Sequence, residues 1–490
     1  MTRRAALALG GGAVGFALGQ RWNPGLAQTE GVALASGASG PLILDDASEL
    51  SATPIAAHSR PQAHGDALVQ VFRDELAAAR AEGRPVNVGA ARHSMGGQAI
   101  PREGRAITVE DGWIEADTQS GVYRVNGGAR WSQVIAALDP LGFGPKVMQS
   151  NNDFGVAATF SVNAHGWAVP FGPMGATVRA LRMVLPDGSL VTASRQENPD
   201  LFALAMGGYG LVGLIVDLEV EMVPNRRLAP RYEAMAAEEF AQAFVAAVED
   251  PGVAMAYGRL NVDRRDFFGE ALLVTLTPTE DQSDLPPAAG SGAVSHIAAE
   301  VYRAQVGRET AKRFRWWIER DVGPAVSGPS TWNSYLNEPV ATLADGDPSR
   351  VDILHEYFVP PAAFGDFLIA CREVIPDAFT EFLNVTLRYV AADPVSLLAH
   401  SPDPRIAAVM SFSQEKSARG EADHARLTRR LIDRVLEIGG SYYLPYRPHA
   451  TPGQFRRAYP RAAEFAEAKR ALDPSLTLRN NLWDSYLEAL

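Results

Sequence analysis

A histidine flanked by two polar side chains follows a short apolar run in the first quarter of the chain. Residues 86–94 read VNVGAARHS, which places His93 between Arg92 and Ser94. The glycine and two alanines before it let the backbone approach a bulky ligand closely and direct successive N–H groups at phosphate oxygens. We therefore expect His93 to contact a phosphate-bearing ligand. The alternative interpretation is a polar turn after a strand, which has the same composition.

A second segment of small residues also ends at a histidine. Residues 151–166 read NNDFGVAATFSVNAHG, so that His165 precedes a glycine. Residues 178–185 and 190–192 beyond it are apolar, and the Pro-Asp-Gly run at 186–188 between them has turn chemistry. The sequence therefore predicts a β-hairpin immediately after this segment.

A third segment begins with a helix signal and ends in a strand. Asn198 is a favourable N-cap residue and is followed by Pro199, which predicts a helix over 201–206. Residues 210–216 read GLVGLIV, and apolar and acidic residues then alternate as far as Met222. That alternation predicts a strand with one buried face.

In this order across residues 85–222, the three segments resemble the FAD-binding domain of vanillyl-alcohol-oxidase, or PCMH-type, oxidoreductases. The resemblance is nearest to the aldonolactone and alditol oxidase branch of that family. It implies an α+β fold, in which a two-part FAD-binding domain of the PCMH type is joined to an α+β substrate (cap) domain. In the family, the first segment contacts the flavin, the second follows the pyrophosphate and ribityl chain, and the third lies along the adenosine half.

The resemblance also implies a covalent bond between His93 and the 8α-methyl group of the flavin. Some relatives attach the flavin through a cysteine as well, at a position that should fall within 150–165, where this chain has no cysteine. Any covalent link is therefore expected through His93 alone. The residues implied to bind FAD are Val88, Gly89, Ala90, Ala91, Arg92, His93, Ser94, Gln98, Ser150, Asn151, Gly155, Val156, Ala158, Thr159, Ser161, His165, Gly210, Ile215 and Asn481.

The sequence gives no indication of a metal site. Cys371 is the single cysteine, so neither an internal disulfide nor a Cys-x-x-Cys pair can form. No His-Glu cluster with metal-ligand spacing accompanies His165. Two interpretations of His165 stay open, namely a flavin contact and a buried histidine satisfied by backbone carbonyls.

Oxidation of an alcohol by a flavin needs a proton acceptor, or a positive charge that stabilises the developing alkoxide. Polyol and aldonolactone oxidases of the family carry glutamate and arginine two residues apart on one strand. Arg388 matches the arginine, but Thr386 stands where the glutamate would be. Arg388 is therefore a catalytic candidate, with a surface salt bridge as the alternative, and the binding of substrate hydroxyls by this strand is in doubt.

Where those oxidases carry a histidine and a lysine after paired glycines, this chain has the run 439–449, which contains Tyr443 and Tyr446. Either tyrosine could hydrogen-bond a substrate or, with a lowered pKa, accept its proton. Both could equally be packing residues. Glu356 lies on a strand that also matches the relatives, and a structural carboxylate is the favoured interpretation of it.

Composition describes an ordinary globular protein. Of the 490 residues 47% are apolar and 21% charged, and the net charge is −12 with no lysine-rich block. These values argue against nucleic acid as a partner. Arg3 and Arg4 precede an uncharged run over 5–20, which matches a twin-arginine export signal and predicts a periplasmic or secreted protein. An uncleaved anchor is the alternative.

These anchors divide the chain into four parts. Residues 1–54 are interpreted as export signal and linker, 55–225 as the FAD-binding domain, 226–440 as the substrate or cap domain, and 441–490 as a return to the FAD domain. The predicted function is that of an FAD-dependent oxidase or dehydrogenase. Its substrate would be an alcohol or lactone-type hydroxyl of a small molecule, with oxygen or another electron acceptor. A flavin-dependent reductase and a non-catalytic flavin-binding redox partner are the alternatives.

Overall fold

The computed structural model describes residues 42–290, 300–339 and 347–490. The predicted export signal therefore lies outside the described residues, as do Arg3 and Arg4. Within the described ranges, no helix combines the length and the apolar character needed to cross a membrane.

The first unit contains a small parallel sheet with strand order β3-β5-β4. Its strands are β3 (Ala57–Ser59), β5 (Arg105–Thr108) and β4 (Val86–Gly89). Helix α2 (Gly65–Glu82) leads from β3 to β4, buries a stripe that includes Leu68, Phe72 and Leu76, and ends at Gly83 with φ of 63°. The left-handed end of the helix suits glycine.

A second, antiparallel sheet of the first unit has the order β10-β9-β11-β7-β6, and β8 also pairs with β11. Its strands are β10 (Leu190–Ser194), β9 (Val178–Val184), β11 (Leu214–Pro224), β7 (Val122–Asn126), β6 (Ile114–Asp117) and β8 (Phe143–Pro145). The predicted hairpin is confirmed, because Leu190 pairs with Val184 and Ser194 with Ala180. Helices of this unit are α3 (Trp131–Leu138), η1 (Asp139–Leu141), α4 (Val156–Ser161), η2 (Met174–Thr177) and α5 (Pro199–Ala205).

Asn198 is the N-cap residue of α5, as predicted, but its side chain does not cap the helix. Its φ is 48°, and its Nδ2 donates to the carbonyl of Thr192 at 2.7 Å. The asparagine therefore joins the helix start to the hairpin.

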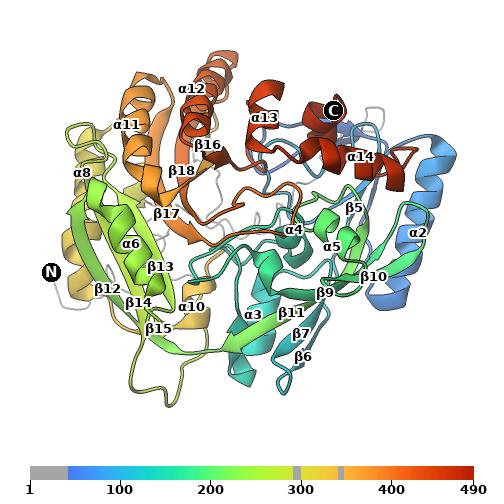
Figure 1. Ribbon diagram of the computed structural model, residues 1–490, viewed down its shortest axis with the longest axis horizontal. Coiled ribbons are helices and arrows are strands. Elements are labelled where there is room, and N and C mark those ends of the chain that lie inside the picture. The colour runs from blue at the N-terminus through green and yellow to red at the C-terminus, as the bar shows by residue number, and fades with distance from the viewer. Residues whose placement is uncertain (1–41, 291–299, 340–346) are drawn as a thin grey trace.

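The second unit is built on an eight-stranded antiparallel sheet with the order β15-β12-β14-β13-β17-β18-β16-β19. The strands are β12 (Arg227–Ala236), β13 (Met255–Leu260), β14 (Glu270–Pro278), β15 (Ser330–Thr331), β16 (Arg350–Val359), β17 (Glu381–Val390), β18 (Arg405–Glu415) and β19 (Ser441–Tyr442). Helices α6 (Phe240–Glu249), α11 (Phe364–Val374) and α12 (Ala418–Glu437) lie on its outer side (Figure 1). The opposite face is turned toward the first unit.

Shorter helices complete the second unit and the C-terminal part. They are η3 (Ala237–Glu239), α8 (Glu309–Trp317), η4 (Ile318–Val322), α9 (Gly323–Val326), α10 (Trp332–Leu336), η5 (Pro361–Ala363), η6 (Ile375–Asp377), α13 (Pro452–Ala458), α14 (Ala462–Leu472) and η7 (Trp483–Leu487).

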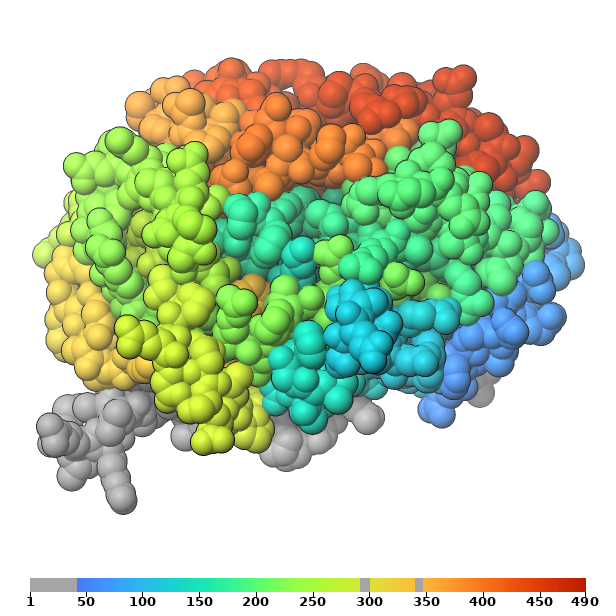
Figure 2. Space-filling model, turned by 60° about the horizontal axis from the view of Figure 1, so that its bottom comes forward, coloured from blue at the N-terminus to red at the C-terminus, as the bar shows by residue number. Residues whose placement is uncertain are grey.

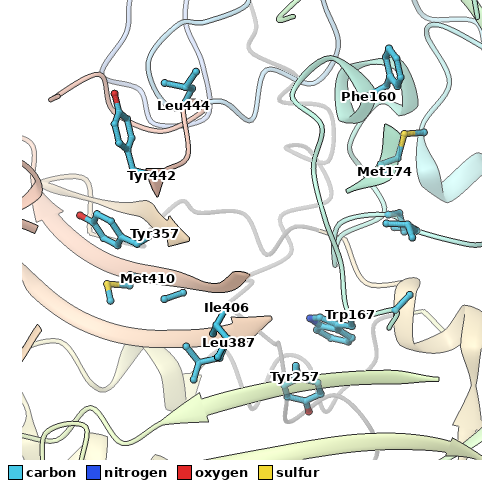
Figure 3. Packing of buried hydrophobic residues seen from close by; sticks show 14 of the residues in the cluster. Phe160, Trp167, Met174, Tyr257, Tyr357, Leu387, Ile406, Met410, Tyr442 and Leu444 are labelled. Carbon is cyan, nitrogen blue, oxygen red and sulfur yellow. The ribbon is translucent and has the colours of Figure 1, made fainter. Parts of the chain in front are cut away.

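The two units are packed against each other along a long contact. Trp167 of the first unit stacks on Tyr257 of β13, with ring centroids 4.9 Å apart (Figure 3). On another face the loop after β14, coloured yellow-green, reaches the cyan and teal surface of the first unit (Figure 2). There the amide of Ala288 donates to Asp139 at 2.9 Å.

Residues 42–54 are not a linker, contrary to the sequence prediction. Strands β1 (Leu42–Leu44) and β2 (Thr53–Ile55) pair antiparallel. Leu44 and Ile55 are buried in a cluster with Ile100 and Ala106. The linker prediction rested on the high content of Ala, Gly and Ser and gave no weight to these few apolar side chains. Their burial holds the segment on the first unit.

The C-terminal part returns to the first unit at β4. Val86 donates its amide to the carbonyl of Thr477 at 2.7 Å, and Leu478 forms a parallel bridge with Val86. The C-terminal residues thus extend the parallel sheet beside the strand that leads to His93.

Candidate flavin and substrate cavity

A cavity lies where the two units meet. Its wall brings together all three segments of small residues and the inner face of the eight-stranded sheet. The predicted FAD contacts that line it are Val88, Gly89, Ala90, Ala91, Arg92, His93, Ser94, Gln98, Ser150, Asn151, Gly155, Ala158, Thr159, Ser161, His165, Gly210 and Ile215. The catalytic candidates Arg388, Tyr443 and Tyr446 line the same cavity.

Two predicted contacts do not line this cavity. Val156 is fully buried at the start of α4, where it packs in the main core. Asn481 instead donates through Nδ2 to the hydroxyl of Thr53 at 3.2 Å. Val156 belongs to the second segment and Asn481 to the C-terminal part, and the side chains of both are buried.

Arg92 anchors the loop after β4 to the neighbouring strand β5. This residue has φ of 51°, and its guanidinium turns back to β5, donating to Thr108 Oγ1 at 2.6 Å and to the carbonyl of Ile107 at 3.2 Å. His93 therefore projects beside the cavity, with its ring centroid 4.3 Å from that of Phe154. Its Nε2 lies 3.5 Å from Asp153, and its buried Nδ1 has no hydrogen-bond partner among the described residues.

The first and second segments approach so closely that glycine is required at their contact. A Cβ added to Gly155 would lie 2.5 Å from the Cβ of Ala90. Gly210 in the third segment has φ of +71°, a conformation that side chains disfavour. These close approaches leave backbone and small side chains along the cavity wall. The residues therefore fit a large phosphate-bearing cofactor.

One face of the sheet supplies a polar wall opposite these loops. Asn384, Thr386 and Arg388 occupy alternate positions of β17, and all three line the cavity. Ser411 of β18 and Glu356 of β16 line it as well. The period of two places these side chains on the same face. Sequence analysis missed Asn384 and Ser411, although buried polar residues within apolar strands could have indicated them.

Arg388 is buried and is not part of a surface salt bridge, which was the alternative interpretation. Nη1 donates to the carbonyl of His165 at 3.2 Å, and Nη2 donates to the hydroxyl of Ser150. Burial lowers the pKa of Arg388, while the nearby charge of Glu356 acts in the opposite direction. The guanidinium is thus a buried positive charge at the cavity wall.

A second buried arginine stands behind the wall. Arg259 of β13 donates to the hydroxyl of Thr386 and, at 3.3 Å, to Asn384 Oδ1. Arg315 also donates to Asn384 Oδ1, at 2.7 Å. Because two guanidinium groups donate to this oxygen, the orientation of the Asn384 amide is fixed. Its Nδ2 therefore points away from both arginines.

The two tyrosines differ in their contacts. The Tyr443 hydroxyl donates to the carbonyl of Val162 at 2.8 Å, and the Tyr446 hydroxyl donates to Glu356 Oε2 at 3.3 Å. Burial raises the pKa of both phenols well above the usual range. The lowered pKa considered in the sequence analysis is therefore wrong.

One interpretation of His165 expected a buried histidine bonded to backbone carbonyls. Its ring is instead hydrogen-bonded to a carboxylate. Its Nε2 lies 2.6 Å from Glu356 Oε1, and the two side chains are 3% and 2% exposed. His165, Glu356 and Tyr446 thus form one connected polar group at the cavity. Glu356, for which a structural carboxylate was the favoured interpretation, lines the cavity.

No group of three or more His, Cys, Asp or Glu side chains with metal-binding geometry occurs in the described parts of the chain.

Comparison with known proteins adds the identity of the first unit. Residues 69–194 match the FAD binding domain family. This part of the chain is an FAD-binding domain. The segments that carry His93, Ser150 and His165 all lie within it, so the cavity loops are those of an FAD-binding domain. The expected resemblance, the α+β fold and FAD as cofactor are confirmed.

Part of the chain is similar to parts of several dehydrogenases and of an oxidase. L-galactono-1,4-lactone dehydrogenase 2 of Oryza sativa is 27% identical over 183 residues, which cover 37% of this chain and 31% of the relative. A putative D-arabinono-1,4-lactone oxidase of Neurospora crassa is 29% identical over 24% of this chain and 21% of its own. Cytokinin dehydrogenase 7 of Oryza sativa is 30% identical over 27% and 26%. The chain thus matches less than a third of the length of these relatives.

Proposed function

We propose that the protein is an FAD-dependent oxidase or dehydrogenase that oxidises a hydroxyl group of a small alcohol or lactone. The observation that carries this proposal is the buried guanidinium of Arg388, which faces the cavity from the sheet opposite the FAD loops. A positive charge fixed by two hydrogen bonds stabilises negative charge that develops on a substrate oxygen. Bound FAD supplies a two-electron acceptor for the hydride.

The rest of the wall suits a hydroxylated substrate. The fixed amide of Asn384 and the hydroxyl of Ser411 offer hydrogen-bonding groups on the same face as Arg388. The names of two relatives, a lactone dehydrogenase and a lactone oxidase, support sugar lactones and related polyols as the substrate class. Oxygen or another acceptor would reoxidise the flavin.

Flavin bleaching under nitrogen tests the proposal. The purified holoprotein is mixed with a panel of alditols, aldonolactones and simple alcohols, and flavin absorbance is followed; we expect at least one member to bleach it. Bleaching by NADPH without any alcohol would indicate the flavin-dependent reductase instead. A flavin that no member reduces would indicate the non-catalytic redox partner. Admitting air to the reduced protein then shows whether oxygen is the acceptor.

We further propose that FAD is bonded covalently to His93, whose Nδ1 lacks a hydrogen-bond partner within the described structure.

We also propose that the protein is exported in folded form through its twin arginine, to the periplasm or beyond. Replacing Arg3 and Arg4 by lysine should retain the precursor in the cytoplasm. Unchanged amounts of periplasmic flavoprotein would show that the arginine pair is incidental.

A further inference from the structure

A chain of three polar side chains leads from the cavity into the protein. Tyr446 lines the cavity and remains partly exposed, and its hydroxyl donates to Glu356 Oε2 at 3.3 Å. The other oxygen of Glu356 lies 2.6 Å from Nε2 of His165. The carboxylate therefore connects a group that a substrate can reach with a histidine that is almost fully buried.

The hydrogen bonds define where the protons sit. Since a carboxylate accepts hydrogen bonds, His165 carries its proton on Nε2 and donates it to Glu356. Its Nδ1 is buried and has no partner in the described structure. Glu356 thus accepts one hydrogen bond on each carboxylate oxygen, from Tyr446 and from His165. The positive charge of Arg388 is close enough to Glu356 to interact with it electrostatically.

We propose that Glu356 is the acceptor of the substrate hydroxyl proton and receives it through Tyr446. This inference rests on the proposed function. The substrate O–H bond breaks and its proton passes to Tyr446 Oη, while the Tyr446 proton passes to Glu356 Oε2. The carbon delivers its hydride to FAD, and the substrate leaves as the carbonyl product. Tyr446 is the catalytic residue of this path, and His165 is a positioning residue for Glu356.

A relay explains how a tyrosine with a high pKa takes part. Burial and the neighbouring Glu356 charge raise the pKa of Tyr446, so a free phenolate is disfavoured at neutral pH. When the phenol passes its own proton on as it accepts another, no phenolate is needed. Other titratable groups that interact with Glu356 electrostatically are Arg388, Tyr443, Tyr209 and Tyr459.

Tyr357 offers a matched control. It follows Glu356 on β16, so its side chain points to the opposite face of the sheet, where it packs near Phe367 with ring centroids 6.3 Å apart. Its hydroxyl has no hydrogen-bond partner among the described residues, and it does not line the cavity. Tyr357→Phe therefore removes a buried phenol oxygen from the same strand without touching the relay.

The test is single-turnover flavin reduction under nitrogen, with the best substrate of the panel, between about pH 5 and 9. We expect Tyr446→Phe to slow reduction by about 10² to 10⁴, as for loss of a general base, with unchanged flavin content and little change in substrate Kd. Glu356→Gln should also be slow, Glu356→Asp should partly restore the rate, and Tyr357→Phe should match wild type.

Two results would overturn the relay: flavin reduction within about threefold of wild type by Tyr446→Phe, or flavin reduction within about threefold of wild type by Glu356→Gln. If Glu356→Gln does not fold, the rate of Tyr446→Phe and its solvent deuterium isotope effect decide. We expect that isotope effect to differ from the wild-type value. A wild-type flavin that no hydroxyl compound reduces contradicts the proposed function instead, so the two failures are distinguishable.

Discussion

Arg388 donates from Nη1 to the backbone carbonyl of His165 at 3.2 Å, although 223 residues separate them in the chain. This hydrogen bond joins β17 of the second unit to the second cofactor segment of the FAD-binding domain. The catalytic candidate is thus oriented by the backbone of the domain that holds the flavin. Any shift between the two units would move the guanidinium relative to the FAD loops.

Arg388→Met should retain FAD but slow flavin reduction. The change removes a charge aimed at the developing alkoxide while keeping an unbranched side chain of similar size, and loss of such a donor costs about 10² to 10³ in rate. Anaerobic stopped-flow measurement of the reduction rate, together with the flavin absorbance of the purified variant, checks this. A rate within about threefold of wild type at unchanged substrate affinity would place Arg388 outside the catalytic machinery.

His93→Ala should release the flavin. If FAD is bonded to His93, the wild-type protein stays yellow after acid precipitation, whereas the variant loses all flavin to the supernatant or binds none. Absorbance of pellet and supernatant gives the result directly. Complete release of flavin from the wild type in acid would exclude the covalent bond and leave noncovalent FAD binding intact.

Acidification should destabilise the fold through buried histidines. Burial lowers the pKa of His355 to about 3, and lowers those of His400 and His424 well below the usual value. As pH falls, these histidines are protonated in the unfolded chain before they are protonated in the folded protein. Their contribution to the free energy of unfolding is therefore complete above about pH 6.5 and is lost as pH falls toward 3. At pH 5 each histidine should cost about 2 kcal/mol relative to pH 8.

His424→Leu tests this assignment, because both ring nitrogens of His424 are buried without a hydrogen-bond partner among the described residues. The variant should lose less stability than wild type between pH 7 and 5, as followed by thermal unfolding at each pH. Parallel decline of the two proteins would show that His424 does not contribute to the acid sensitivity.

Cys371 should be chemically inert in the folded protein. It is fully buried in α11, and burial raises the pKa of its thiol well above the usual value. Reaction with a thiol reagent requires the thiolate and access to it. We expect no labelling of the native protein and one equivalent in urea; rapid native labelling would show that α11 opens.

The cofactor half of the site could be predicted from sequence because its signals are local. Gly155 and Gly210 lie in runs whose small residues serve a close approach of backbone to ligand, and such runs are recognisable without the fold. The substrate half depends on contacts across the sheet. Nothing near Asn384 in sequence indicates that Arg259 and Arg315 hold its amide, since those residues come from other elements.

Glu356 illustrates the same limit. Its strand was expected from the resemblance, but its partner His165 is 191 residues away in the chain. Register between β16 and β18 and the docking of the two units bring the pair together. The linker prediction for residues 42–54 was wrong because it rested on local composition. The composition is that of a linker, but a few buried apolar contacts hold the segment on the first unit.

The parallel bridge between Val86 and Leu478 makes completion of this part of the fold a late event in the synthesis of the chain. Strand β4, which carries the chain to His93, is synthesised early, whereas its neighbours Thr477 and Leu478 are synthesised near the end. The hydrogen bond from Val86 to Thr477 can therefore form only after every residue that lines the cavity has been synthesised.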